Sequence, residues 1–229
     1  LKPWFKSSAV HQYVTDGEPL GDVLYIERGS KPTAPETAYL NQFKTILESR
    51  SEFVNNGRPW QELHRARERR IFEGPKLVCS YRTYNNSFAY NETPFYAGAD
   101  LTLITADASA QIDLFYLLGL LNSSLMYTWF YHRGKRKGDM LELKAVPVSE
   151  VPIARSEQLE KKIAAVARTA HSELTKTPGA NINQLNVKLD ELVYELYELG
   201  ELEKQAVGDF AKSKSAIRKM ASAADTETA

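Results

Sequence analysis

The sequence has little cysteine, no net charge and no signal-peptide pattern. Its one cysteine, Cys79, cannot form an internal disulfide, which is typical of proteins from a reducing compartment. The 29 Lys and Arg residues balance 29 Asp and Glu residues, so the overall positive charge typical of nucleic-acid-binding proteins is missing. The chain opens on Leu1, and no cleavable apolar leader follows it. We therefore expect a cytoplasmic chain that is part of a longer protein.

Motifs for catalysis and cofactor binding are absent as well. The histidines show no metal-ligand spacing with another His or Cys; they are His11, His64, His132 and His171. No Gly-rich loop follows a strand and opens a helix, and no Gly-x-Ser-x-Gly elbow occurs. Cys79 lies in a strand-like stretch, where a buried structural thiol is commoner than a nucleophile. We predict no catalytic residue, no metal and no cofactor in this chain.

What the sequence does contain is a succession of strand and helix patterns. Hydrophobic residues make up 43% of the chain, which is enough for a folded core. Runs rich in β-branched and aromatic residues predict strands at 23–28, 76–82, 87–91, 99–106 and 140–153. Apolar residues at helical spacing predict helices at 35–50, 110–132, 156–174 and 182–199, with a short one within 200–210. The predicted fold class is α/β (α+β), with a mixed sheet.

The longest apolar run requires a choice between a membrane helix and a core helix. Residues 114–131 carry no charge, and this length is close to that needed to cross a bilayer. Asn122, Ser123 and Ser124 lie at the centre of the run, and predicted strands flank it. We therefore expect a buried core helix and no membrane contact.

The composition changes after residue 153. Two helices joined by the short turn "TKTPGAN" are predicted to form an antiparallel hairpin. The residues after 210 are small and polar, which is typical of a disordered end. The chain is therefore divided into a body (1–153), a helical appendix (154–210) and a disordered tail (211–229).

The charges that cancel overall are unevenly distributed along the chain. Residues 58–82 hold seven Lys and Arg against three Asp and Glu, and residues 133–139 hold four against one. Residues 182–210 hold two against seven. A neutral chain can thus carry a basic face and an acidic face. The alternative is that each run is an ordinary solvated surface.

The basic stretches combine cations with aromatic and amide side chains. Lys and Arg neutralise phosphates, Arg pairs with guanine edges and Asn pairs with adenine edges. The segment "GKRKG" is predicted to be a loop whose glycines allow close approach to a duplex. We predict DNA phosphate contacts from Arg58, Arg65, Arg67, Arg133, Lys135, Arg136 and Lys137. The candidate base-reading residues are Arg82, Tyr84, Asn85 and Asn86. The alternatives are a solvent-facing helix in which acidic neighbours pair with the arginines, and a plain hairpin turn at "TYNN".

The order of several stretches resembles a known family over about residues 1–210. These stretches are "KPWFKSS", "VLYIE", "YLNQFKTILESR", "PWQELHRAR", "PKLVCSYR", "FAYNE", "FYLLGLLNSSLMYTWFY", "GKRKG" and "VPI". Together they resemble the TaqI-like C-terminal specificity domain, which is the target-recognition domain of adenine-specific DNA methyltransferases in restriction-modification systems. The later "LDELVYELYELGELEKQAV" resembles the helical ending of such proteins.

This resemblance implies that the chain reads double-stranded DNA for a catalytic domain that precedes it. In the family, an N-terminal methyltransferase domain binds S-adenosylmethionine, and an Asn-Pro-Pro-Tyr motif holds the flipped adenine. The present sequence has no Asn-Pro-Pro-Tyr motif. The resemblance therefore implies a parent methyltransferase, or a combined methylase and type II restriction enzyme, whose cofactor and chemistry lie in that domain. Two alternatives stay open: a protein-interaction or subunit-assembly module built on the C-terminal helices, and part of a nuclease site.

Overall fold

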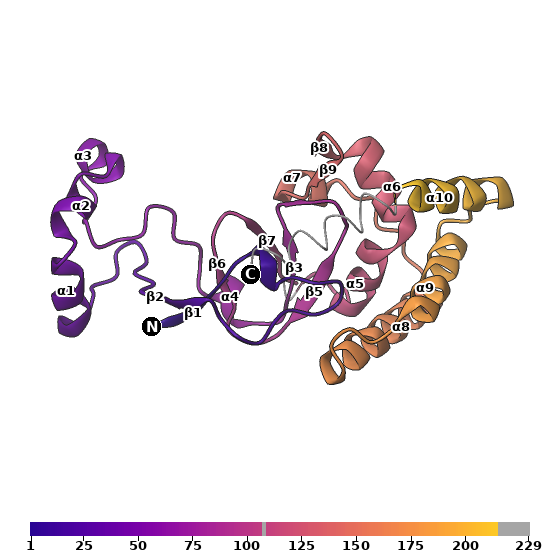
Figure 1. The fold of residues 1–229 in the computed structure, drawn as a ribbon, viewed down its shortest axis with the longest axis horizontal. Helices are drawn as coiled ribbons and strands as arrows, with labels where there is room; N and C mark the ends of the chain where they lie inside the picture. The colour runs from indigo at the N-terminus through magenta and orange to yellow at the C-terminus, as the bar shows by residue number, and fades with distance from the viewer. Residues whose placement is uncertain (107–108, 215–229) are drawn as a thin grey trace.

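The computed structural model describes residues 1–106 and 109–214, which form three small sheets and a set of helices (Figure 1). A helical arm, the sheets and the C-terminal helices follow one another along the longest axis. The predicted α/β (α+β) class is confirmed. The helices are α1 (Ala34–Asn41), α2 (Lys44–Glu48), α3 (Ser51–Asn56), α4 (Arg70–Glu73), α5 (Leu114–Asn122), α6 (Ser124–Arg133), α7 (Ala145–Ser149), α8 (Glu157–Lys176), α9 (Asn183–Leu196) and α10 (Glu201–Ser213).

Each sheet has three strands. In spatial order they are β2 (Gly21–Val23), β1 (Lys2–Phe5) and β6 (Tyr96–Ala97); β5 (Phe88–Asn91), β3 (Lys76–Ser80) and β7 (Leu101–Ile104); and β4 (Arg82–Thr83), β9 (Met140–Glu142) and β8 (Lys135–Lys137). The β1–β6 pair is parallel and the other pairs are antiparallel. The strands predicted at 76–82, 87–91 and 99–106 are confirmed with shorter bounds. The strand predicted at 23–28 is wrong after Val23, and the one predicted at 140–153 ends at Glu142, before α7.

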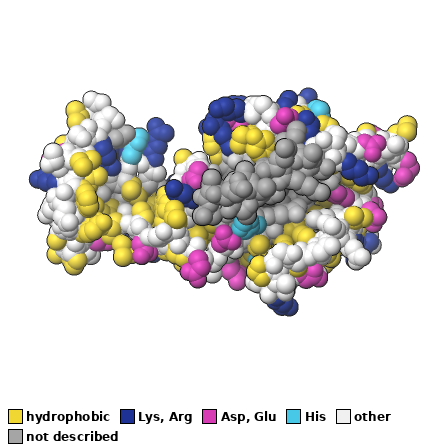
Figure 2. All heavy atoms as spheres, in the orientation of Figure 1, with side chains coloured by type: hydrophobic (Ala, Val, Ile, Leu, Met, Phe, Trp, Pro, Cys, Tyr) yellow, Lys and Arg dark blue, Asp and Glu magenta, His cyan; other side chains and the backbone are white. Residues whose placement is uncertain are grey.

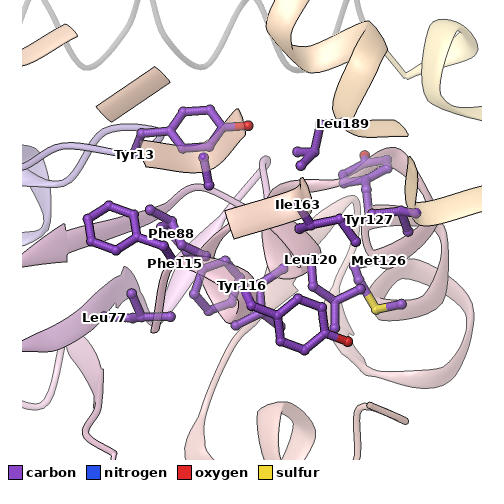
Figure 3. Packing of buried hydrophobic residues seen from close by; sticks show 14 of the residues in the cluster. Tyr13, Leu77, Phe88, Phe115, Tyr116, Leu120, Met126, Tyr127, Ile163 and Leu189 are labelled. Carbon is purple, nitrogen blue, oxygen red and sulfur yellow. The ribbon is translucent and has the colours of Figure 1, made fainter. Parts of the chain in front are cut away.

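One hydrophobic core extends from the central sheet into the C-terminal helices (Figure 3). Helix α5 contacts β3 and β5 as well as α8 and α9. Gly119 permits the close approach of α5 to α8, because a Cβ atom there would lie 2.7 Å from Cγ2 of Ile163. The division at residue 153 stays a prediction, but the parts on either side of it share this core.

The predicted single helix at 110–132 is wrong, because the chain breaks it into α5 and α6. Ser123 has an extended backbone, and its hydroxyl accepts a hydrogen bond from the Met126 N–H at the start of α6. The Asn122 amide exchanges two hydrogen bonds of 2.9 Å with the backbone of Phe88 in β5. The carboxylate of Asp190 accepts from the Ser124 backbone N–H and hydroxyl. The polar centre of this apolar run therefore forms a buried, hydrogen-bonded helix junction, and the prediction that the run belongs to the core is confirmed.

Tyr13 connects the N-terminal segment to the C-terminal helices. It is fully buried and has a left-handed backbone with φ of 72°, which is rare for a large side chain. Its carbonyl oxygen lies 2.9 Å from Nδ1 of His171 in α8, and its hydroxyl donates to Oδ1 of Asn186 in α9 at 2.8 Å. Its backbone N–H also donates to the carbonyl oxygen of Phe88 in β5 at 2.8 Å. These contacts on three elements hold the strained backbone in place.

The helical arm, which comprises α1, α2 and α3, differs from the helix predicted at 35–50. Instead of one amphipathic helix at 35–50, the chain forms the three short helices α1, α2 and α3. A capping box between Thr33 and Glu36 starts α1. None of the residues of α1 and α2 is buried, and Tyr39, Phe43 and Ile46 are 54%, 41% and 70% exposed. The apolar face expected to enter a core is therefore on the surface. Within residues 60–72, only the residues of α4 are helical.

The C-terminal helices agree with the predicted hairpin. The long helices α8 and α9 pack side by side after a short turn, and the third helix is present as α10 (Figure 1). Helix α10 continues to Ser213, so the first residues of the predicted tail 211–229 are helical; the part from residue 215 lies outside the described residues. Across residues 1–106 and 109–214, no helix has the length and apolar character needed to cross a membrane.

A buried lysine in β3 makes the stability of the fold depend on pH. Nζ of Lys76 donates to the carbonyl oxygens of Gly74 and Thr93 at 2.9 and 2.7 Å, and no described carboxylate pairs with it. Burial lowers the pKa of Lys76 from 10.5 to about 8. Between these values the unfolded chain holds a proton that the folded chain has released, so the stability contributed by Lys76 rises with pH across this window.

We expect Lys76→Met to remove this pH dependence. From pH 7 to pH 10 the unsubstituted chain should gain about 1–3 kcal/mol of unfolding free energy relative to the variant. The reason is that only the unsubstituted chain has a buried lysine that loses its charge over this range. Urea unfolding of both proteins at the two pH values measures the difference. Parallel pH profiles for the two proteins would show that Lys76 is charged at pH 10 in the folded state.

Candidate nucleic-acid interface

The segment predicted as a basic loop is a β-hairpin at the end of α6. Lys135, Arg136 and Lys137 form strand β8, so the prediction of a loop is wrong for these three residues. The two-residue turn to β9 places Gly138 first, with φ of 63°, as a type II′ turn requires. All three cations of β8 are exposed, because β8 is the edge strand of its sheet. We call β8, β9 and their turn the basic hairpin.

Strand register separates the cations of the basic hairpin. Lys135 pairs with Glu142, which pairs in turn with Arg82 of β4, so these three side chains share one face of the sheet. Lys137 lies two residues further along β8 and therefore shares that face. Arg136 pairs with the buried Leu141 and points to the other face. Its Cζ lies 4.0 Å from the Tyr131 ring centre, and its guanidinium donates to Gly138. Lys135 and Lys137 thus face outward, whereas Arg136 supports the hairpin.

One carboxylate lies among the cations of this face. Oε1 of Glu142 accepts from Nε of Arg82 at 3.0 Å and from the Tyr81 hydroxyl at 3.1 Å. Hydrogen bonding from Arg82 lowers the pKa of Glu142, so this carboxylate stays ionised. Nζ of Lys144 lies 4.3 Å from the Tyr81 ring centre. Glu142 offsets the charge of Arg82, but among the described residues no carboxylate pairs with Lys135, Lys137 or Arg133, the last residue of α6.

A second basic segment lies between α3 and α4. Arg58 donates to the carbonyl oxygen of His64 at 2.7 Å, and Arg67 donates to that of Gly98 at 3.2 Å. These bonds fix the path of the segment and leave each guanidinium only partly free. Arg65 is exposed, and no described acidic group pairs with it. Figure 2 shows a hollow between the arm and the body, with Lys and Arg side chains over this segment on one side and over the basic-hairpin end of the body on the other.

The predicted base-reading residues have different environments. Arg82 is exposed on the outer face of the basic-hairpin sheet. Tyr84 and Asn85 are half-buried in the turn that follows β4. Asn86 is only 2% exposed, and its amide nitrogen donates to the carbonyl oxygens of Leu121 and Ser123. Asn86 therefore holds the helix junction, and its role as a base reader stays a prediction that this buried position does not support.

Sequence reasoning also missed contributors to this face. Tyr81, Glu142 and Lys144 join Arg82 around one set of contacts, although about sixty residues separate β4 from β9. Only the pairing of β4 with β9 brings them together, and no local pattern signals it. Arg69 belongs to the second basic segment by sequence, but it pairs with Glu27 at 2.8 Å.

Both a protein family and a solved structure resemble this chain. A family model described as the TaqI-like C-terminal specificity domain matches residues 33–153, a range that contains both basic segments. A similar fold occurs in the type IIL restriction-modification enzyme MmeI, solved in complex with DNA, with a TM-score of 0.51 and 14% sequence identity. The match covers 91% of the present chain but 37% of the MmeI chain, so the chain corresponds to just over a third of that protein. At this identity the likeness concerns the fold alone. No match was found among curated proteins.

Proposed function

Because the chain belongs to the family of TaqI-like C-terminal specificity domains, we propose that it recognises double-stranded DNA for a restriction-modification enzyme. The observation that carries this proposal is the hollow with a basic segment on each side (Figure 2). Lys135 and Lys137 face outward on one side, and Arg65 is exposed in the segment on the other. Cations without acidic partners are the groups that replace counterions on a duplex.

The geometry supports a division of labour between the cations. The cations that contact phosphates are Lys135, Lys137, Arg133 and Arg65. Their contacts set the register of the protein on the duplex but carry no sequence information. Arg82 is the better base reader, because Glu142 orients its guanidinium on the same face. A guanidinium held in this way recognises O6 and N7 of guanine in the major groove.

The chemistry belongs to the parent protein in this proposal. The parent is an adenine-N6 methyltransferase, or a combined methylase and restriction enzyme, located in the cytoplasm. Its N-terminal domain binds S-adenosylmethionine and partners the present chain across the duplex. The sequence motifs quoted for the family support this assignment, and so does the size of MmeI, of which the match covers 37%. The target adenine leaves the stack to reach a catalytic pocket, so the specificity domain holds the flanking duplex.

We expect Lys135→Ala/Lys137→Ala to weaken binding to all duplexes about equally. The slope of log affinity against log salt should flatten by roughly 0.9 for each phosphate that the variant no longer neutralises. Arg136 is left in place because it packs on Tyr131. Titrations of a labelled duplex with the full chain at several salt concentrations measure both quantities.

The matched control removes the same charge from the C-terminal hairpin. Lys162→Ala/Lys188→Ala changes two exposed lysines of α8 and α9, and it should leave the salt slope unchanged. Equal slopes for the native chain and the Lys135/Lys137 variant would remove the basic hairpin from the DNA interface. No salt-dependent binding by the full chain would contradict the proposed function.

The alternative function, a docking module built on the C-terminal helices, has weaker support. The apolar faces of α8 and α9 are used inside the chain, because Ile163, Ala167, Leu189 and Val193 belong to the shared core. The helices thus brace the body. The acidic residues left on their outer faces would repel phosphates, so we place the DNA on the opposite, basic side of the molecule.

A further inference from the structure

The last helix, α10, does not pack on the α8–α9 hairpin as a simple continuation of it. Its main contact is with α6, which leads directly into the basic hairpin. The ring of Phe210 lies 5.1 Å from that of Tyr131 and 4.8 Å from that of His132, both in the last turn of α6. Val207 and Ala211 of the same helix are buried. Helix α10 is therefore seated against the base of the basic hairpin.

Two hydrogen bonds extend this contact to the turn of the hairpin. Oδ1 of Asp139, the second turn residue, accepts from the Tyr131 hydroxyl at 2.6 Å and from Nζ of Lys214 at 3.0 Å. Nζ of Lys214 also lies 4.5 Å from the Tyr131 ring centre, and the Arg136 guanidinium lies 4.0 Å from that centre. The bond from Tyr131 and the pairing with Lys214 lower the pKa of Asp139, so the carboxylate stays charged. The turn is thus held from α6 and from the end of α10 at once.

We propose that α10 sets the position of the basic hairpin, with Asp139 and Lys214 as the positioning residues that join them. The proposal rests on the proposed function and adds to it, because it gives a helix that is not itself predicted to contact phosphates a part in DNA binding. Strand β8 is an edge strand and β9 pairs with β4 over only two residues, so the hairpin has little support of its own. Fixing it before the duplex arrives lowers the entropy lost on binding.

Asp139→Asn separates positioning from charge, because the two effects have opposite signs. Removal of a negative charge beside phosphates alone would tighten binding. Loss of the ion pair to Lys214 should weaken it, by about two- to fivefold if the bond is worth what exposed pairs usually contribute. Asn retains an acceptor for the Tyr131 hydroxyl and the shape of the side chain, so the variant should fold. The matched control is Asp209→Asn, which removes an exposed charge from α10 itself.

The measurements are duplex titrations of the full chain and amide hydrogen exchange over residues 135–142 without DNA. We expect Asp139→Asn to bind more weakly and to exchange faster in the hairpin, with Asp209→Asn like the native chain in both. Phe210→Ala, which changes no charge, should act in the same direction as Asp139→Asn. If Asp139→Asn binds as tightly as Asp209→Asn and the hairpin exchanges at the native rate, the positioning role is wrong. If the native chain shows no salt-dependent DNA binding, the proposed function fails, and the exchange data still decide whether α10 holds the hairpin.

Discussion

A chain that ends at residue 153 should lose cooperative folding. The truncation removes buried aliphatic side chains of the shared core, among them the four residues Leu159, Ile163, Leu189 and Val193. At about 1.5–3 kcal/mol for each buried side chain, the loss is about 6–12 kcal/mol, which equals the whole stability of a typical domain. It also exposes the face of α5 around Gly119 and leaves Tyr13 without its partners on α8 and α9.

Urea unfolding followed by near-ultraviolet circular dichroism measures this effect. The native chain should give a sigmoidal transition, and the truncated chain should give none. Point variants show whether packing is the cause: Ile163→Ala should destabilise the full chain by about 2–5 kcal/mol, while Leu202→Ala, at a residue that is 83% exposed, should change little. A truncated chain with a native-like transition would show that residues 1–153 are an independent domain.

Asn122→Ala should cost about 1–3 kcal/mol of unfolding free energy, because it leaves the buried N–H of Phe88 without a partner and removes one of the two hydrogen bonds to the Phe88 carbonyl oxygen, which keeps the bond from Tyr13. The same change removes the residue that ends α5 at the helix junction. Asn41→Ala is the matched control, since Asn41 ends α1 in the same way but is exposed and should change stability by less than about 0.5 kcal/mol.

Thermal and urea unfolding of both asparagine variants compare the two positions. A second variant, Asn122→Asp, keeps an acceptor for the Phe88 N–H but places a buried carboxylate against the Phe88 carbonyl oxygen, so near neutral pH it should destabilise the chain at least as much as Asn122→Ala. Equal stability of Asn122→Ala and Asn41→Ala would mean that water satisfies the Phe88 backbone and that the amide is dispensable.

Sequence patterns predicted the parts of this fold that local residues determine. The strand at 76–82 is visible because β3 lies between two strands and has an apolar centre at residues 77–79, and α8 and α9 show their buried faces at helical spacing. The helix junction was not predictable, because the break between α5 and α6 depends on distant contacts. Asn122 bonds to β5, and Ser124 bonds to Asp190 of α9. The arm shows the opposite error: its apolar spacing predicts burial, but no element of the described chain covers it.

The candidate site was predictable in its charge and not in its individual residues. The excess of cations at 133–139 indicated a basic surface, and the structure places Lys135 and Lys137 on one outward face. Asn86 and Arg67 have the residue types of DNA contacts, but backbone carbonyl oxygens of this chain occupy the amide nitrogen of Asn86 and part of the Arg67 guanidinium. Whether a polar side chain is free depends on which backbone groups need a partner, and that follows from the fold as a whole.

The contacts of Tyr13 have a consequence for the order in which the chain can fold during synthesis. Its partners on α8 and α9 lie 158 and 173 residues further along the sequence. At roughly 5–20 residues per second, a ribosome needs about 10–35 s to reach Asn186 after it has added Tyr13. In the later part of that interval, once α5 has been made, β3 and β5 are available but α8 and α9 are not, so nascent chains expose an apolar face of α5. Such long sequence separations also predict slow refolding, with the last two long helices docking late.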